Sequence, residues 1–410
     1  MNRSFLLSLY EEAVRVSKPR YCLPEHFSSF ARNKRVCILG AGKAAADMAV
    51  EAYKYFGDNA YGLVVTRYGY ENTEPTGNIE VRLAAHPVPD ENSVEGAKAL
   101  LSLASKVKSS EDVIFLISGG GSSLACAPPH GISLDEKLAL HKFLLRSGAS
   151  IEEMNTVRKH VSVIKGGRLA AASKGKNTSL VISDVVGDDP AFIASGLTVQ
   201  DTTKPEDAIA ILDKYDFCNE SRIRDYLNHA LPLPKVSGGY TLVANAQSAI
   251  DAAVGKAKAA GWDTEIISYT EKGEAQTVAK RHAQIAREYK KKGKPILLLS
   301  GGELTVTLGD SKGEGGPNQE YLMALARELG GEPGISALAA DTDGVDGSKD
   351  VAGGYIDEHT LAEAEKKGLE VDALLKEHNS FSFFDVLDAH IAIGPTRTNV
   401  NDFRVISVST

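Results

Sequence analysis

A segment rich in glycine and serine follows an apolar run in the first half of the chain. The run DVIFLI ends at residue 117, and the next residues are Ser118, Gly119, Gly120, Gly121, Ser122 and Ser123. Consecutive glycines weaken helices and strands, but they let several backbone N–H groups point at one anion, and serine hydroxyls add donors. The segment predicts a phosphate-binding loop, with a tight strand exit that binds no ligand as the alternative.

A similar pattern recurs later in the chain. The apolar run ILLL is followed by Ser300, Gly301 and Gly302, and then by Glu303. We interpret Gly301 and Gly302 as a second loop of the same kind after a second strand. Two such loops favour phosphate binding over a chance turn.

Lys43 stands in the segment GAGKAAADM, directly after the apolar run VCIL. The segment matches a dinucleotide fingerprint only in part, because Ala45 replaces the third glycine and the next strand ends at Arg67 instead of an acid. A lysine at the start of a helix meets the positive end of the helix dipole, which is unfavourable unless an anion lies nearby. Lys43 is therefore predicted to contact an anionic substrate or a phosphate, and a solvent-exposed lysine is the alternative.

Acidic residues cluster after two other apolar runs. They are Asp184, Asp188 and Asp189 in SDVVGDDP, and Asp341, Asp343 and Asp346 in ADTDGVDG, with Glu303 and Glu320 in the same half of the chain as the second group. Magnesium takes one or two carboxylates together with phosphate oxygens and water, so a few of these acids would suffice. Turn chemistry explains some of them equally well, and the closing glutamate of a calcium-binding EF-hand loop is absent.

The elements that must position these residues are short β-branched runs that alternate with helical patterns. This alternation is typical of βα units, in which the loops after the strands line the ligand crevice. We therefore predict two three-layer α/β domains with mainly parallel sheets, the first of them Rossmann-like. The turn-rich stretch NHALPLPKVSGGY suggests domains of residues 1–235 and 236–410. Two such domains imply an active site in the cleft between them.

Composition narrows the class of protein. The chain has 410 residues and a formal charge of −8, which argues against nucleic acid as a partner. No apolar run approaches the length that spans a bilayer, and the first residues suit an amphipathic helix more than a signal peptide. The four cysteines form no pair of the metal or disulfide type, which favours a cytoplasmic protein. Self-association into a homo-oligomer is compatible with all of this.

Several motifs together resemble the glycerate 2-kinase family whose carboxy-terminal part is called the MOFRL domain, labelled hydroxypyruvate reductase in older naming. The motifs are, in order, GAGKAAADM, LISGGGSSL, NTVRKHVSVIKGGRLA, ISDVVGDDPAFIASG, LLLSGGELTVT, GGPNQE, ADTDGVDG and GPTRTNVND. Each motif alone is weak evidence for the resemblance, but together the motifs are specific for this family. The resemblance implies phosphorylation of D-glycerate at its 2-hydroxyl, with ATP and Mg²⁺, giving 2-phosphoglycerate.

The resemblance also implies roles for particular residues. Lys43 would be the leading catalytic residue, and the triple-glycine loop would hold phosphates. Asp184 or Asp188 would orient or deprotonate the attacking hydroxyl or hold the metal, with Asp188, Glu303 and Asp343 as the candidate metal ligands. Arg158 and Lys165 become candidates for substrate binding, although a solvated helix face is the ordinary explanation for such charges. His86 could contact substrate or only cap a turn.

Two departures from the family pattern concern arginine. Many relatives have an arginine where this chain has Pro317, and a glycine where this chain has Arg397. We hypothesise that Arg397 supplies the missing guanidinium for a phosphoryl group or a carboxylate and is both catalytic and substrate-binding.

Two alternatives from other classes remain open at this stage. One is an NAD(P)H-dependent hydroxypyruvate reductase, which the older label suggests and the broken fingerprint disfavours. The other is a non-catalytic protein that binds a sugar phosphate or a nucleotide. The sequence does not decide the enantiomer, the nucleotide, the oligomeric state, the carboxylates that bind metal, or whether Arg397 replaces the arginine missing at Pro317.

Overall fold

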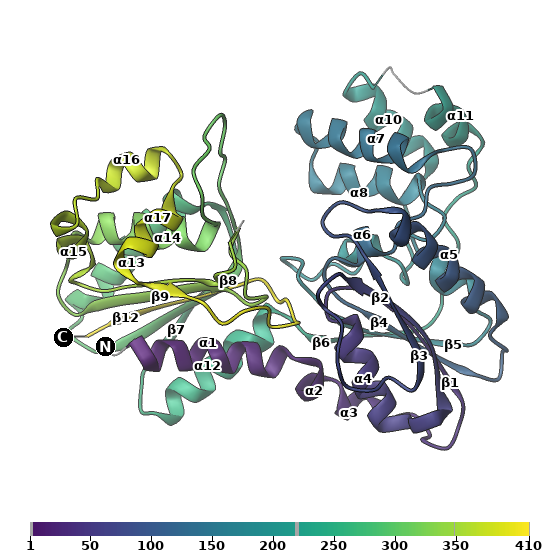
Figure 1. The fold of residues 1–410 in the computed structure, drawn as a ribbon, viewed down its shortest axis with the longest axis horizontal. Coiled ribbons are helices and arrows are strands. Elements are labelled where there is room, and N and C mark those ends of the chain that lie inside the picture. The colour runs from purple at the N-terminus through teal and green to yellow at the C-terminus, as the bar shows by residue number, and fades with distance from the viewer. Residues whose placement is uncertain (1–2, 218–220, 348, 410) are drawn as a thin grey trace. The chain divides into compact units, whose positions relative to one another are not determined.

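The computed structural model describes residues 3–217, 221–347 and 349–409 (Figure 1). The chain forms two compact units, each with one six-stranded sheet. The amino-terminal unit is Pro19–Val243, and the carboxy-terminal unit combines the residues up to Lys18 with Ala244–Thr410. The boundary after Val243 thus lies eight residues beyond the predicted one after residue 235, and the first residues belong with the carboxy-terminal unit.

The sheet of the amino-terminal unit has the strand order β3-β2-β1-β4-β5-β6. The strands are β1 (Val36–Ala41), β2 (Ala60–Arg67), β3 (Asn78–Ala84), β4 (Asp112–Ile117), β5 (Lys176–Ile182) and β6 (Gly239–Ala244). The pairs from β3 to β5 are all parallel, with Val36 of β1 opposite Ala60 of β2 and Asp112 of β4. This is the Rossmann-type order, in which the chain reverses its direction of progress between β1 and β4.

Helices cover both faces of this sheet. They are α2 (Pro19–Cys22), α3 (Pro24–Phe27), α4 (Ala45–Phe56), α5 (Glu91–Lys106), α6 (Gly121–Leu124) and α9 (Arg168–Ala172). Leu39, Val65 and Phe115 point to one face and pack with α5 and α9, whereas α4 contacts β1, β2 and β4. Alternation along the strands therefore buries apolar side chains on both faces, as in a three-layer α/β domain.

Four further helices of this unit form a layer of their own beyond the sheet (Figure 1). They are α7 (Leu134–Arg146), α8 (Ile151–His160), α10 (Pro205–Lys214) and α11 (Ser221–His229). A separate apolar core that includes Leu140, Val157 and Leu212 joins them. Both α7 and α8 begin with a capping box, formed by Ser133 with Glu136 and by Ser150 with Glu153.

The sheet of the carboxy-terminal unit is mixed, with the order β11-β10-β9-β12-β8-β7. Its strands are β7 (Thr264–Glu274), β8 (Ile296–Thr305), β9 (Ile335–Asp341), β10 (Gly353–Ile356), β11 (His390–Ile391) and β12 (Asp402–Val408). Strands β7, β8, β9 and β11 run in one direction, but β12 and β10 lie between them in the other, so only β7 and β8 pair in parallel. The prediction of mainly parallel strands therefore holds for strand direction in this sheet and not for most of its pairs.

Helices again lie on both faces of this second sheet (Figure 1). They are α1 (Arg3–Ser17), α12 (Ala246–Ala259), α13 (Ala275–Lys291), α14 (Pro317–Leu329), α15 (Thr360–Lys366), α16 (Val371–Lys376) and α17 (Ser380–Leu387). Helix α1 packs beside α12, and its Tyr10 donates a hydrogen bond to the carbonyl of Asp341 at 2.7 Å. The buried side of α1, including Leu6 and Leu9, explains why the first residues belong to this unit.

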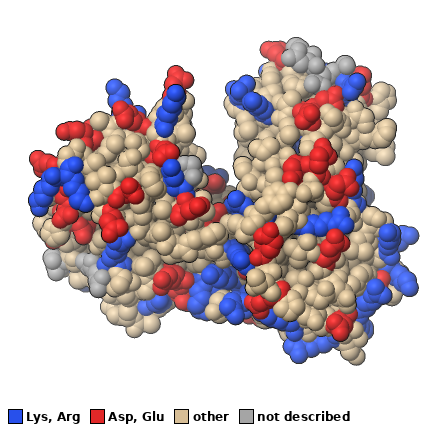
Figure 2. Space-filling view, in the orientation of Figure 1, with Lys and Arg blue, Asp and Glu red and all other residues tan. Residues whose placement is uncertain are grey.

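Charged side chains of both signs lie among one another on the face shown in Figure 2. Across the described ranges, no helix is both long and apolar enough to cross a membrane.

Candidate active site

The loops after β1 and β4 are joined by two hydrogen bonds. The N–H of Lys43 donates to the carbonyl of Gly119 at 2.8 Å, and the N–H of Ala44 donates to Oγ of Ser118 at 3.0 Å. These loops flank the point where the strand order reverses, which is where open α/β sheets bind ligands. Two segments singled out from the sequence, 76 positions apart at Lys43 and Gly119 (119 − 43), thus meet at the expected crevice.

Three functional side chains lie against the glycines of the β4 loop. A Cβ added to Gly119 would lie 2.0 Å from Oδ2 of Asp184. A Cβ added to Gly120 would lie 2.9 Å from Cδ2 of His86 and 3.3 Å from Cγ of Lys43, and Gly120 also has a φ of +79°. The glycines therefore allow a cation, a carboxylate and an imidazole from the ends of three strands to approach one loop. This brings together Lys43, Asp184 and His86.

The structure separates the two candidate carboxylates of this unit. The side chain of Asp184, which follows β5, lies against Gly119 of the glycine loop. Asp188 is a half-buried turn residue with a φ of +56°, whose N–H donates to the carbonyl of Val185 at 2.9 Å. Burial raises the pKa of Tyr240, and the charges of Asp188 and Asp189 raise it further. Of these two carboxylates, Asp184 is the one whose side chain the described structure places against Gly119.

A chain of hydrogen bonds fixes Ser122 in the same loop. The amide nitrogen of Asn155 donates to a carbonyl of its own helix, so its Oδ1 accepts from Ser195 at 2.9 Å. Ser195 then accepts from Ser122 at 2.8 Å, and Ser122 Oγ accepts from Lys165 at 2.9 Å. Lys165 also donates to the carbonyls of Ser122 and, at 3.5 Å, of Ala125. Its three N–H donors are thus directed at the loop, which indicates that Lys165 holds the loop in place; direct binding of substrate by Lys165 stays a prediction.

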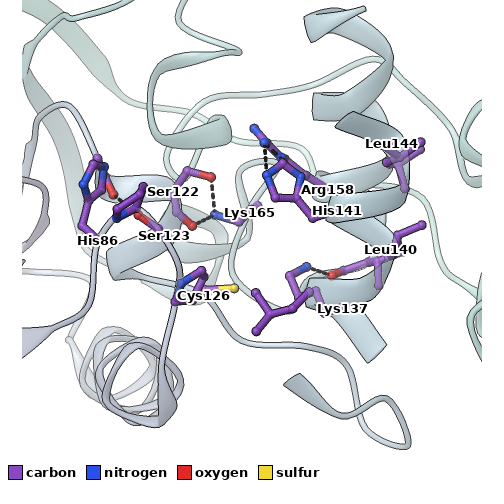
Figure 3. A pocket seen from close by; sticks show the side chains of 16 residues that line it. His86, Ser122, Ser123, Cys126, Lys137, Leu140, His141, Leu144, Arg158 and Lys165 are labelled. Carbon is purple, nitrogen blue, oxygen red and sulfur yellow. Dashed lines mark hydrogen bonds between the residues drawn. The ribbon is translucent and has the colours of Figure 1, made fainter. Parts of the chain in front are cut away.

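A cavity of about 260 Å³ opens beside this loop (Figure 3). Its apolar wall comes mainly from α7 and α8 and consists of Leu138, Leu140, Leu144, Val157 and Val161. Its basic groups are His86, Lys137, His141, Arg158 and Lys165. Arg158, predicted to bind substrate, lies against the ring of His141, with Nη2 2.7 Å from Nε2.

Sequence reasoning missed Lys137 and His141. Both lie on the same face of α7 as Leu140 and Leu144, since positions three, four and seven apart face one way on a helix. A lysine on the apolar stripe of an amphipathic helix was the available signal. Lys137 is 7% exposed, and its ammonium group donates to the carbonyl of Val161.

Burial, together with the surrounding cations, controls the charge of this cavity. Burial lowers the pKa of Lys165 to about 7, and the nearby charges of Lys137 and Arg158 lower it further. Burial lowers the pKa of His141 to about 4, and the nearby charges of Arg158 and the two lysines contribute to this, so the ring is neutral at pH 7. Burial lowers the pKa of Lys137 as well.

The predicted second glycine loop is not a loop. Gly301, Gly302 and Glu303 lie inside β8, which continues to Thr305 because β7 pairs with it that far. Gly302 has a φ of +94°, and a Cβ there would lie 2.2 Å from the carbonyl oxygen of Glu271, at an irregularity between β7 and β8. These glycines are therefore explained by strand packing, and the expected strand exit was wrong.

The carbonyl groups of the same segment accept hydrogen bonds from Arg404. It is 1% exposed and donates to the carbonyls of Gly301 at 3.4 Å and Gly302 at 3.3 Å, and to Asp402 at 3.0 Å. The buried guanidinium is thus held by its own sheet.

The acids of ADTDGVDG are largely engaged in holding their own loop. Asp346 accepts from the backbone N–H groups of Asn318 at 3.0 Å and Gln319 at 2.9 Å, at the start of α14. Burial raises the pKa of Asp346 to about 6, against the lowering effect of these hydrogen bonds. Asn318 also donates to Asp402 at 2.7 Å. The motif PNQE therefore ties α14 to the loop, a structural role that sequence reasoning missed.

At the other end of this loop, Asp343 is hydrogen-bonded to Thr396, the residue before Arg397. Asp343 is 5% exposed, its Oδ1 accepts from Val345 at 2.9 Å, and its carbonyl accepts from Thr396 at 3.0 Å. Arg397 is half-buried with a φ of +63°. Pro317 and Arg397 therefore border the same loop from its two ends.

Comparisons with known proteins agree with this division of the chain. Residues 5–228 match a family model described as a domain of unknown function, DUF4147, and residues 296–402 match the MOFRL family. A D-glycerate 2-kinase of Thermotoga maritima is 39% identical over 90% of this chain and 90% of its own. A crystal structure of a glycerate kinase from the same organism has a TM-score of 0.92 at 36% identity, with 99% of each chain covered.

This chain belongs to the glycerate 2-kinase family. Labels within the family differ, since an Agrobacterium vitis relative with a provisional hydroxypyruvate reductase label is 41% identical over 99% of this chain and 94% of its own. The glycine loop and Lys43 fall within the DUF4147 match, and the loop of Asp343 falls within the MOFRL match. The DUF4147 match also includes most of α1, although α1 packs in the carboxy-terminal unit of this glycerate 2-kinase family member.

Proposed function

We propose that this protein transfers the γ-phosphoryl group of ATP to the 2-hydroxyl of D-glycerate, giving 2-phosphoglycerate and ADP. The observation that carries the proposal is the convergence of Lys43 and Asp184 on a glycine loop at the point where the strand order reverses. A cation, a carboxylate and a loop of backbone donors are what phosphoryl transfer to a hydroxyl requires. A solved structure titled glycerate kinase has the same fold over nearly the whole chain.

The geometry suggests a role for each group. The 2-hydroxyl oxygen forms a bond to the γ-phosphorus, the bond from that phosphorus to the bridging oxygen breaks, and ADP leaves. Asp184 accepts the hydroxyl proton or orients the hydroxyl, and Lys43 neutralises charge on the transferred group. Because the transition state is loose, position and charge should matter more than the strength of the base.

A dinucleotide-dependent reductase fits the same loops less well. The N–H groups of Lys43 and Ala44, which would face a pyrophosphate at a Rossmann helix start, already donate to the β4 loop. A Cβ on Gly42 would lie 2.6 Å from the carbonyl oxygen of Ser118, so the β4 loop fills the space beside this turn. We expect no oxidation of NADH with hydroxypyruvate.

The test is ATP consumption by the purified protein with D-glycerate and Mg²⁺, followed by phosphorus NMR. We expect a phosphate ester on carbon 2. Phosphate on carbon 3, or NADH oxidation without ATP consumption, would reject the proposal, and nucleotide binding without turnover of either kind would favour a non-catalytic binding protein.

Magnesium belongs to the proposal as the ion that enters with ATP and neutralises phosphate charge. Within the described ranges, no group of three or more His, Cys, Asp or Glu side chains is placed to hold a metal ion. Mg²⁺ does not need such a group, because phosphate oxygens and water supply most of its ligands. Asp343 fits poorly because its carboxylate already accepts from Val345, whereas Asp188 and Glu303 are more accessible in their own units. The cytoplasmic location and a homo-oligomeric state stay predictions.

Arg397 gives a prediction in which stability and activity change in opposite directions. A left-handed backbone costs a non-glycine residue about 1 kcal/mol, so Arg397→Gly should raise the free energy of unfolding by about that amount. If Arg397 binds a phosphoryl group or a carboxylate, the same change should lower kcat/KM about 10²-fold. Thermal unfolding and steady-state kinetics measure both effects.

Asp388→Gly is the matched control, since Asp388 has a φ of +55° at the end of α17. It should gain stability and keep its kcat/KM. Near-normal kcat/KM in Arg397→Gly would remove Arg397 from the active site.

A further inference from the structure

The cavity beside the glycine loop holds buried positive charge without a protein counter-charge. In the described part of the chain, Lys137, Arg158 and Lys165 form no ion pair within 4.0 Å, and no Asp or Glu lines the cavity. Elsewhere in the same unit a buried lysine is paired, as Lys159 is with Asp201. Burying charges without partners is unfavourable, so the missing counter-charge is expected to come from an anionic ligand.

The number of charges indicates which anion this is. Glycerate brings a single carboxylate, which can pair with one of these three basic groups. A nucleoside polyphosphate brings several negative charges on a chain of phosphates, which matches cations spread from Arg158 to the glycine loop.

The apolar wall indicates what else the ligand carries. The branched side chains of α7 and α8 offer no donor or acceptor to the hydroxyls of a three-carbon acid, but they suit the flat face of a heterocyclic base. The guanidinium of Arg158 lies at this wall beside a neutral His141, and planar guanidinium groups stack on aromatic rings.

We infer that this cavity is the nucleotide pocket, in which the adenine base lies against the wall of α7 and α8 and the phosphates pass Arg158 toward the glycine loop and Lys43. This inference rests on the proposed function for the identity of the nucleotide. In this inference Lys165 holds the loop that lies beneath the phosphates. Glycerate then binds on the other side of Gly120, beside Lys43 and Asp184.

The test places a larger side chain at a half-buried position of the apolar wall. Leu138 lines the cavity on α7, whereas Leu145 on the same helix is 56% exposed and does not line it. We expect Leu138→Trp to raise the dissociation constant of ADP, measured by calorimetry, and the KM for ATP at least tenfold. The KM for glycerate and the affinity for tripolyphosphate, which has no base, should change less than twofold. Leu145→Trp should leave all four values within twofold.

The outcomes separate this inference from the proposed function. A raised KM for glycerate with unchanged ADP affinity would overturn the inference, because the cavity would then hold the acceptor. Unchanged values for both ligands would overturn it as well. Loss of ADP binding in Leu138→Trp, in a protein that does not phosphorylate glycerate, would support the pocket and reject only the proposed acceptor.

Proton uptake gives a second readout. Phosphates near Lys165 should raise its pKa above about 7, so ADP binding at pH 8 should take up protons, which calorimetry in two buffers of different ionisation enthalpy measures. The groups that face Lys165 are Ser122 and Cys126 of the loop, Lys137 and His141 of α7, and Arg158 of α8. Lys165→Met should reduce this uptake, and binding with no proton uptake in the unmodified protein would contradict the inference.

Discussion

Replacing Lys43 with alanine should lower kcat about 10³-fold while leaving the fold intact. The side chain of Lys43 lies beside Gly120 on the glycine loop, where it can neutralise the transferred phosphoryl group. The bond that joins the two loops uses the backbone N–H of Lys43, which alanine retains. The melting temperature should therefore stay close to that of the unmodified protein, and single-turnover kinetics with saturating ATP would measure the loss in the chemical step.

Two comparisons make this result specific. Lys54→Ala removes a lysine from α4, the helix that follows Lys43, where it forms ion pairs with Glu51 and Glu74, and it should leave kcat within twofold. Lys43→Arg keeps the charge but changes its shape, so it should recover part of the lost rate. A kcat for Lys43→Ala within tenfold of the unmodified protein would show that the phosphoryl group is neutralised by another residue.

The fold class was accessible from the sequence because it depends on local patterns. Apolar runs such as DVIFLI, followed by helical patterns, identify βα units without knowledge of their neighbours. The Rossmann-like prediction implied an order of strands, but it did not identify the contacts between loops that follow when β1 lies beside β4 and the N–H of Lys43 donates to Gly119. The convergence of the site is a consequence of this pairing.

Dependence on distant elements also explains why the predicted strand exit at Gly301 was wrong. Ser-Gly-Gly after an apolar run is a strand exit at Gly119, and at Gly301 it is an irregular stretch inside a longer strand. The difference depends on β7 and on the buried Arg404, both far from Gly301 along the chain. The amphipathic pattern of α1 likewise predicted a helix, but the core into which its apolar face packs is set by α12, more than 200 positions away.

Lys137 shows a third limit. The sequence shows that Lys137 lies on the apolar stripe of α7. It does not show whether the ammonium group stays buried or reaches past the core to solvent. Only the cavity, and the absence of an Asp or Glu from its described lining, make Lys137 a candidate for ligand binding.

Replacing Gly119 with alanine should lower kcat/KM about 10²-fold through displacement of Asp184. The added Cβ would lie 2.0 Å from Oδ2 and 2.4 Å from Cγ of Asp184. The short side chain of Asp184 must rotate away, whereas the backbone at Gly119 does not require a left-handed conformation that alanine would resist. Thermal unfolding should therefore change little, and the loss should appear in steady-state kinetics with glycerate.

A double-mutant cycle tests whether the effect passes through Asp184. If Gly119→Ala acts only by moving that carboxylate, it should have little further effect on kcat/KM in an Asp184→Ala background, because the group it displaces is already absent. Gly255→Ala, in the open middle of α12, is the control for an added methyl group and should keep full activity. Additive losses in the cycle would instead mean that Gly119 acts through its backbone on the phosphates, and that Asp184 and the glycine loop contribute to the transition state independently.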